Sequence, residues 1–443
     1  MLVNIHKLIF ILLLFIGWNS ARAQEVWTLK QCIDTAQVHN KNLQINRNNI
    51  IISEQKNKEA KANLIPKITA NADYKYFWEL PTQLMPLSAL NPTVSEGQFR
   101  DLQFGVPHNI NANVQLAMPI YNPQLYGAIK VTKAAGEVNQ LQYQKSEEQV
   151  LYDITTLYYN AQILQHQLIF LDSNLRNTGK LLKNTVLLKE QLLAKGSDVS
   201  KVRLQAEQLA TQREVANNKY NQILNTLKLN MGIDLNTELQ VESDVVLKSP
   251  VDYTPTSSLD FKIIQTQNKL LQSELTTLRQ SRFVPSLSLF ATYGTTGFGY
   301  DKKPNEFLKF YPLGFAGIQL SYPIFNGTVT QRKINRKKFE IKNNELQAEL
   351  IADKNKMEIE NASQQRAVAQ KNITTTQSQI DLAQTIYNQT LLQQKQGTAT
   401  LTDVLLADNS LREAQQNYLN AVIDYLKADL ELKRLMGQLR IKN

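Results

Sequence analysis

The sequence predicts a mainly helical protein with a duplicated unit, in which two amphipathic β-strands precede a hairpin of two long helices. Three observations predict this class. Short matching segments recur in the same order in both halves, strand-length segments alternate between apolar and polar residues, and long stretches without helix breakers carry heptads of apolar residues. A period of about 200 residues exceeds that of any solenoid repeat, so it indicates a duplicated domain.

The first 23 residues are predicted to form a secretory signal peptide. Lys7 precedes an apolar run over residues 8–16, and the small residues Ala21 and Ala23 flank Arg22, which places cleavage after Ala23. No later segment reaches about 18 uninterrupted apolar residues, so no transmembrane helix is expected in the mature chain. The net charge of +10 falls to +8 when Lys7 and Arg22 are removed, and export argues against nucleic acid as a partner.

Four matched segments place the first repeat at residues 24–250 and the second at residues 251–443. The offsets between them are 219, 204, 201 and 205 residues, so the halves are nearly in register after the first loop. The matches are Leu64–Ile68 with Phe283–Leu287, Gln115–Asn122 with Gln319–Asn326, Ala194–Gly196 with Lys395–Gly397, and Leu229–Gly232 with Arg434–Gly437.

Strict alternation predicts strands at about residues 66–77, 109–121, 285–294 and 315–325. In the first strand, for example, Ile68, Ala70 and Ala72 alternate with Thr69 and Asn71. Segments of this length suit tilted strands that cross a bilayer. Four strands cannot close a barrel, and open edges are not tolerated in lipid, so other copies of the chain would have to complete the sheet. A soluble sandwich with one wet face is the alternative. Residues 78–108 and 295–314 are expected to be external loops.

Long helices are predicted at about residues 123–194, 198–231, 327–395 and 400–436. Asn122 is a suitable N-cap and Pro123 a suitable first helical residue. The first helix would be roughly 105 Å long at 1.5 Å per residue. Apolar residues recur every seven positions along two helices, and such a pattern predicts a coiled-coil seam. In the first helix these residues are Ile154, Ala161, Leu168, Leu175 and Leu182. In the last helix they are Val404, Leu411, Tyr418, Tyr425 and Leu432. A second row of small residues in the last helix, Ala407, Ala414, Ala421 and Ala428, lies three positions after Val404, Leu411, Tyr418 and Tyr425.

From about Leu29 to Gly437 the sequence resembles the TolC family of outer-membrane efflux channels. The residues that carry the resemblance are the strand-to-helix passages Met118–Asn122 and Tyr322–Gly327 and the helical turn Gly397–Ala407. The resemblance implies a homotrimer in which twelve strands form one barrel in the outer membrane and twelve helices form a periplasmic tunnel. It further implies a periplasmic adaptor protein and an inner-membrane pump as partners, and an outer-membrane location in a Gram-negative-type cell with a large periplasmic part.

The resemblance also implies where the channel narrows. The hairpin turns at Gly196 and Gly397 would lie at the periplasmic tip and contact the adaptor. In the family an acidic residue stands six positions after the hairpin glycine, and here Asp403 does so in the second half, whereas Val202 occupies that place in the first. The hypothesis is that Asp403 favours cations at the tip and helps to hold it closed; a solvated turn aspartate is the alternative. The candidate constriction residues are Asp403, Asp198 and Lys201.

A basic cluster directly follows the fourth predicted strand. It would lie near the inner leaflet of the outer membrane and contact lipid headgroups, or it would form a solvated helix face. Its residues are Arg332, Lys333, Arg336, Lys337 and Lys338.

No enzyme, cofactor or metal site is predicted. His39, His108 and His166 lie far apart, and the lone Cys32 excludes an intrachain disulfide. The glycines at 294, 297 and 299 are interpreted as a flexible loop, since no helix follows them as in a phosphate loop. The sequence thus favours a passive export channel of a tripartite pump over a periplasmic structural coiled-coil protein or a surface adhesin. It does not identify the cargo.

Overall fold

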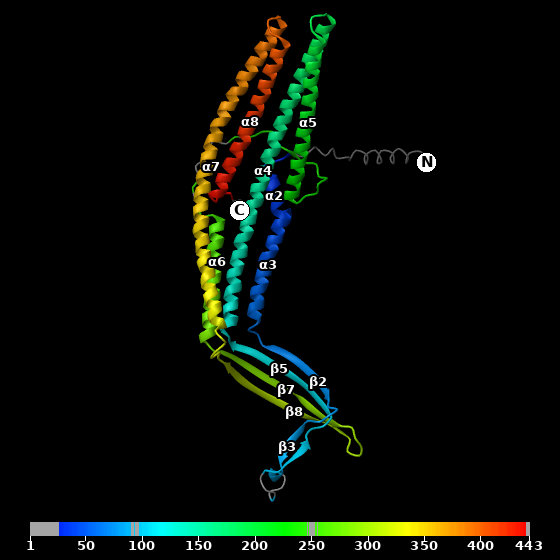
Figure 1. The fold of residues 1–443 in the computed structure, drawn as a ribbon, viewed down its shortest axis with the longest axis vertical. Coiled ribbons are helices and arrows are strands. Elements are labelled where there is room, and N and C mark those ends of the chain that lie inside the picture. Colours follow the sequence, from blue (N-terminus) through cyan, green and yellow to red (C-terminus); the bar gives the residue numbers. More distant parts are fainter. Residues whose placement is uncertain are drawn as a thin grey trace, which may run out of the picture. The chain divides into compact units, whose positions relative to one another are not determined.

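The computed structural model describes residues 26–89, 93, 97–245, 247, 253–254 and 256–439. The helices are α2 (Leu29–His39), α3 (Lys41–Ala62), α4 (Pro123–Glu190), α5 (Gly196–Met231), α6 (Leu259–Phe283), α7 (Val329–Lys395) and α8 (Leu401–Leu435) (Figure 1). The strands are β1 (Val26–Trp27), β2 (Lys67–Tyr76), β3 (Thr82–Pro86), β4 (Phe99–Gln103), β5 (His108–Tyr121), β6 (Gln240–Val241), β7 (Ser286–Tyr300) and β8 (Phe307–Ser321). Among the described helices, none is both long and apolar enough to cross a membrane.

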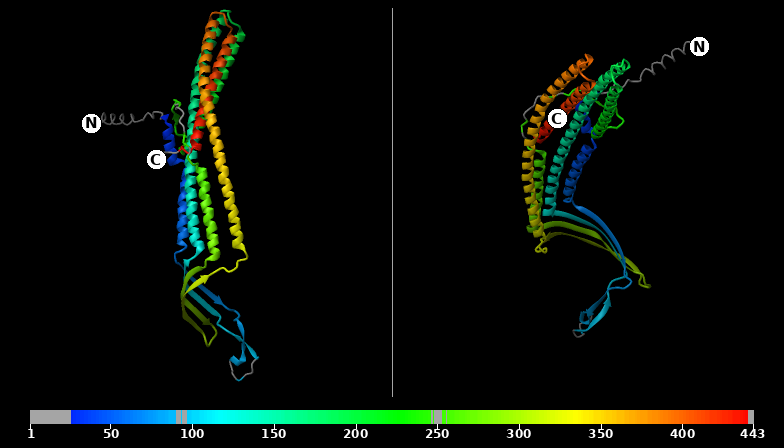
Figure 2. Two further views of the ribbon diagram at one scale, coloured as in Figure 1. Left: turned by 90° about the vertical axis from the view of Figure 1, so that its left-hand side faces the viewer. Right: turned by 45° about the horizontal axis from the view of Figure 1, so that its top comes forward.

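The long helices form two hairpins, α4 with α5 and α7 with α8 (Figure 2). The backbone N–H groups of Gln124 and Leu125 donate to Asn122 Oδ1 at 2.9 and 3.4 Å, so Asn122 caps α4 as its sequence context predicts. In the second half the helix starts at Val329, two residues later than predicted, because Gly327 and Thr328 both take positive φ values of 65° and 67°.

The chain contains two compact units. The first consists of the described residues within 1–50, 139–264 and 347–443, and the second of residues 51–138 and 265–346. The first unit holds α2, α5, α8 and most of α4 and α7. The second holds a four-stranded antiparallel sheet, most of α3 and α6, and the beginnings of α4 and α7.

Cys32 lies in the main core of the first unit, where it is completely buried with Ile154, Leu227 and Met231. Burial raises the pKa of its thiol to about 12, so the thiol stays protonated and inert. The chain turns sharply beside this core at Gly232, whose φ is 74°. A Cβ at this position would overlap the backbone of His39, and this overlap explains why a glycine follows Met231.

The seam predicted along α8 is confirmed in nearly every position, because all the seam residues given above except Tyr418 are buried. Along α4 the predicted seam is only partly correct. Ile154 and Ala161 are fully buried, but farther along Leu168, Leu175 and Leu182 are only partly buried. The buried positions there are Leu171, Asn174, Thr178, Leu181 and Thr185. A straight helix has 3.6 residues per turn and drifts from a seven-residue repeat, so the contact face moves from the predicted positions to neighbouring ones that combine leucines with polar residues.

The sheet of the second unit has the strand order β2-β5-β7-β8. Every neighbouring pair is antiparallel, and the register aligns Ile68 with Leu116, Leu116 with Ala291, and Ala291 with Ala316. One face of the sheet is therefore apolar across all four strands, as the alternation predicts. β2 and β8 are the outer strands, and nearly every residue along both is solvent-exposed.

Two predicted loops are wrong in extent. β7 continues to Tyr300 and β8 begins at Phe307, so only residues 301–306 remain of the loop expected at 295–314. The glycines at 294, 297 and 299 lie within β7, where neighbouring atoms leave no room for a Cβ: backbone of β5 at Gly294, and the Phe310 ring at Gly297. The loop expected at 78–108 contains the β3–β4 hairpin.

Candidate functional site: the helical hairpin tips

The tips of the α4–α5 and α7–α8 hairpins share one backbone motif. At the second tip, Gly397 takes a left-handed φ of 78°, and the N–H of Thr398 donates to the carbonyl of Gln393 at 3.0 Å. At the first tip, Leu192 takes a φ of 64°, and the N–H of Leu193 donates to the carbonyl of Leu188 at 2.8 Å. Both helices thus end in the motif that normally places a glycine at the left-handed position.

This motif corrects the match between the halves. The counterpart of Gly397 is Leu192, 205 residues earlier, and not Gly196, which is the first residue of α5 with an ordinary negative φ. Leucine at a left-handed position strains the backbone, since its Cβ crowds the following carbonyl. Sequence comparison missed the pair because it aligned the two glycines.

The same shift makes Asp198 the counterpart of Asp403. Each is the third residue after its helix N-cap, Lys195 or Thr400, and each accepts a hydrogen bond from the backbone N–H of that cap, at 3.2 and 2.8 Å. Thr400 Oγ1 also donates to Asp403 at 2.6 Å and accepts from its N–H at 3.2 Å. These bonds hold the pKa of Asp403 below its ordinary value. The predicted difference between the tips, a carboxylate in one half and Val202 in the other, is therefore wrong.

Below the capping residues the two hairpins pack on an apolar cluster. Val202 of α5 and Val404 of α8 are both completely buried, together with Leu181 of α4 and Tyr387 of α7. Val202 is thus a core residue, although sequence comparison placed it beside the constriction. Lys201 Nζ, which is exposed, donates to Thr402 Oγ1 of the other hairpin at 3.4 Å. The structure thereby brings Lys201 to the first turn of the helix that carries Asp403.

A buried polar group lies next to this cluster. The Asp408 side chain accepts a hydrogen bond from Gln205 Nε2 at 2.9 Å and pairs with Arg412 at 2.6 Å, and only 5% of Asp408 is exposed. Burial raises the pKa of Asp408, while Arg412 and Gln205 oppose that rise. Sequence reasoning missed the group. The spacing of Asp408 and Arg412 is a detectable i,i+4 signal, but Gln205 comes from another hairpin and gives none.

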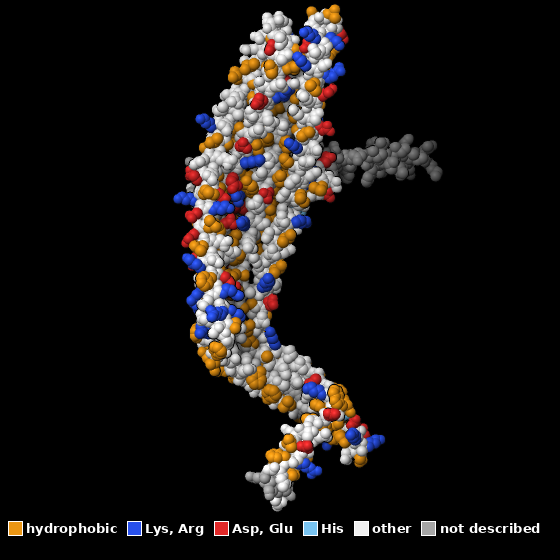
Figure 3. Space-filling model, viewed as in Figure 1, with side chains coloured by type: hydrophobic (Ala, Val, Ile, Leu, Met, Phe, Trp, Pro, Cys, Tyr) orange, Lys and Arg blue, Asp and Glu red, His pale blue; other side chains and the backbone are white. Residues whose placement is uncertain are grey.

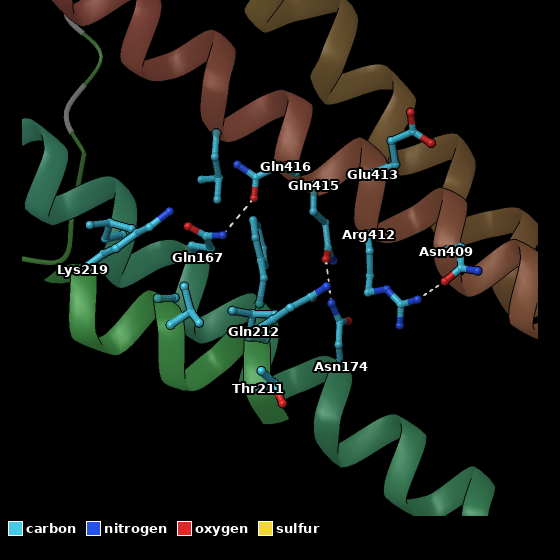
Figure 4. A pocket seen from close by; sticks show the side chains of 16 residues that line it. Gln167, Asn174, Thr211, Gln212, Lys219, Asn409, Arg412, Glu413, Gln415 and Gln416 are labelled. Carbon is cyan, nitrogen blue, oxygen red and sulfur yellow. Dashed lines mark hydrogen bonds between the residues drawn. The ribbon is translucent and has the colours of Figure 1, made fainter. Parts of the chain in front are cut away.

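Arg412 also borders a polar groove of about 660 Å³ between α4, α5 and α8 (Figure 4). Across it, Gln167 Nε2 donates to Gln416 at 3.0 Å and Asn174 Nδ2 donates to Gln415 at 3.0 Å, both from α4 to α8. These amide pairs join the two hairpins, and the Gln167–Gln416 pair is open to water whereas Asn174 is buried. A neutral hydrogen bond contributes only about 0.5–1.5 kcal/mol net.

The basic cluster lies at the start of α7 in the second unit (Figure 3). Lys337 is only 12% exposed and pairs with Glu274 at 2.6 Å and with Glu340, so it is not available to a headgroup. Arg332, Lys333 and Lys338 are exposed. Large apolar side chains are exposed at the end of α6, in the segment between β8 and α7, and at the start of α7: Phe283, Tyr322, Ile324, Phe325 and Phe339. Basic and aromatic side chains together are typical of a membrane–water interface.

Two further predictions concern the signal-peptide cleavage site and metal binding. The cleavage position, Ala23, lies outside the described residues. Within the described part of the chain, no group of three His, Cys, Asp or Glu side chains is arranged to hold a metal ion.

Comparison with known proteins gives consistent matches. Residues 272–438 match the family described as outer membrane efflux protein. The chain is 23% identical to outer membrane protein TolC of Escherichia coli K12, over 96% of this chain and 84% of TolC. Its fold is similar to that of the Campylobacter jejuni CmeC outer membrane channel (TM-score 0.75, 16% identity, 93% of this chain and 85% of that one) and of Vibrio cholerae VceC (TM-score 0.72, 15% identity, 92% and 96%). The resemblance to the TolC family is thereby confirmed.

Proposed function

We propose that this chain, a relative of the outer membrane efflux proteins, is a passive export channel of the outer membrane that gives cargo an exit from the periplasm. One observation of the structure carries the proposal. The four-stranded sheet is apolar across one whole face, and among the described strands none pairs with the outer edge of β2 or of β8. In a soluble periplasmic coiled coil the apolar face of this sheet would be exposed to water, so that alternative is not favoured.

The unpaired strands support a homotrimer. Backbone N–H and C=O groups without partners cost several kcal/mol each in hydrocarbon, so a sheet in the membrane must close on itself. Joining β8 of one copy to β2 of the next would remove every edge, and three copies would supply twelve strands. The four helices α4, α5, α7 and α8 of each copy would likewise supply a twelve-helix tunnel.

The helical tips are the proposed constriction and adaptor contact. Three copies would bring together Asp403 and Asp198, six capping carboxylates in all, with Lys201 beside them. The ring would favour cations. The turns at Gly397 and Leu192–Gly196 would meet a periplasmic adaptor, and an inner-membrane pump would supply the energy, so the channel itself performs no reaction.

The exposed basic residues at the start of α7 are the proposed lipid contact. Arg332, Lys333 and Lys338 stand beside exposed aromatic side chains and would bind anionic headgroups of the inner leaflet, whereas Lys337 would not. We expect the R332Q/K333Q variant to retain less anionic phospholipid through detergent purification than the wild type. Quantitative lipid analysis checks this, and equal retention would leave the cluster as a solvated helix face.

Single-channel recording tests the function as a whole. The purified protein should migrate as three copies, fractionate with outer membranes and conduct ions when added to a planar bilayer. A protein that is released by osmotic shock and never conducts would be a periplasmic coiled coil. A trimer that stays in the membrane without conduction would be a surface structure such as an adhesin.

A further inference from the structure

The sheet has a second face, and its chemistry changes between the two halves of the chain. On β2 and β5 this face carries Asn71, Asp73, Asn109 and Asn111, which is the polar surface that the alternation predicts. On β7 and β8 the same face carries six aromatic side chains, which we call the aromatic strip: Phe290, Phe298, Tyr300, Phe307, Tyr311 and Phe315.

The register of the strands shows that the strip and the polar residues share one face. Asp73 is aligned with Asn111, Asn111 with Thr296, and Thr296 with Tyr311. In the same way, Thr69 is aligned with Gln115, Gln115 with Thr292, and Thr292 with Phe315. Side chains that are directly opposite in a sheet point to the same side, so the strip lies on the side opposite to the apolar face.

The rings of the strip contact one another in pairs. Ring centroids are 6.3 Å apart in the edge-on pair Phe290–Phe315 and 6.0 Å apart in the pair Phe298–Tyr311. About half of Tyr311 and of Phe315 is still exposed in the protomer, at 52% and 51%. Phe290 also covers the bare backbone of Gly317, and this contact gives that ring a structural role. Neither Tyr311 nor Phe315 is among the nearest neighbours of any glycine in the described part of the chain.

The proposed function determines what the face with the aromatic strip contacts, and this inference rests on that function. If the apolar face contacts lipid, the strip lines the water-filled channel. A contiguous group of exposed aromatic side chains is typical of an interaction or ligand-binding surface. The negative faces of aromatic rings attract organic cations, and rings stack on rings. The proposed carboxylates at the tips would favour the same charge.

We propose that the aromatic strip is a binding surface for aromatic organic cations that pass through the channel. Such a cargo would meet Tyr311 and Phe315 from each copy. It would gain cation–π and stacking contacts, whereas an aliphatic cation of equal charge would gain only the cation–π contacts.

Block of single-channel current tests the inference. Tetraphenylphosphonium is the aromatic probe and tetrapropylammonium is the aliphatic control of the same charge. We expect tetraphenylphosphonium to block the wild-type channel at a lower concentration. The Y311L/F315L variant should raise the half-blocking concentration by about fivefold to tenfold, because the cation loses one or two ring contacts. Phe298→Leu, on the neighbouring strand, is a second variant in case the first does not insert.

The matched control is Phe310→Leu on β8. Phe310 is 52% exposed like Tyr311 but points to the apolar face, and leucine there still covers Gly297. This variant should leave the block unchanged. Equal block of the wild type by both cations would overturn this inference and leave the proposed function standing. The same holds if the Tyr311, Phe315 and Phe298 substitutions leave the block unchanged in channels of normal conductance. Absence of any conductance in the wild type would instead overturn the proposed function together with it.

Discussion

At the scale of single residues, the capping aspartates combine a structural role with a charge. Asp403 and Asp198 hold the first turns of α8 and α5, and hydrogen bonds from Thr400 lower the pKa of Asp403. A carboxyl with a lowered pKa stabilises the fold above its ordinary pKa and loses that contribution as the pH falls through its folded value. Asp403 is therefore charged at neutral pH.

Asparagine substitutions separate the two roles, because an amide oxygen still accepts the capping hydrogen bond but carries no charge. We expect Asp403→Asn and Asp198→Asn each to reduce the preference for cations by a similar amount, and the double variant to reduce it further. Reversal potentials in a salt gradient measure the preference. Asp353→Asn, an exposed acid on α7, is the control and should have no effect. An effect of Asp403→Asn alone would contradict the equivalence of the tips.

At the scale of elements, the two hairpins are joined by an apolar cluster and by the buried Asp408 group. A buried carboxylate whose positive partner is removed is strongly destabilising. The group also gives the contact between hairpins a pH dependence. Burial raises the pKa of Asp408, so the folded tip binds a proton more tightly than the unfolded chain, and its stability falls as the pH rises above about the ordinary value of 3.8.

We expect Arg412→Met to destabilise the tips by about 3 kcal/mol at neutral pH, since it leaves Asp408 buried and charged. The loss should shrink as the pH is lowered, because protonation neutralises the carboxyl. Adding Asp408→Asn should restore most of the stability. Hydrogen exchange of the tip helices, corrected for the intrinsic pH dependence of exchange, measures these effects. A loss that is independent of pH, or no rescue by the second substitution, would show that packing alone is responsible.

At the scale of the whole molecule, the two faces of β8 predict how the chain enters a membrane. Ile318 belongs to the apolar face and Gln319 to the opposite face of the same strand, and both are exposed in the protomer. A lysine that faces lipid costs about 2–4 kcal/mol at the bilayer midplane and up to about 1 kcal/mol near an interface, where Ile318 lies three residues from the end of β8. A lysine in a water-filled lumen costs little.

Ile318→Lys should therefore lower the amount of trimer in the outer membrane, and Gln319→Lys should leave it near the wild-type level. Membrane fractionation followed by electrophoresis without heating measures both. Equal yields would mean that the apolar face does not contact lipid. The assignment of the other face to the lumen would then also be wrong.

The sequence by itself determined the duplicated unit, the alternating strands and the long helices, because periodicities of two and of about three and a half residues are local properties of the chain. It also located the basic cluster and Asp403. Only the tertiary structure decided that Leu192 corresponds to Gly397 and Asp198 to Asp403, that Gln205 reaches Asp408, and that aromatic rings replace amides along one face of β7 and β8. The first two depend on the backbone conformation of each turn, which residue identity alone did not reveal. The last two depend on how separate segments pack and align, and a small shift in that register changes every partner.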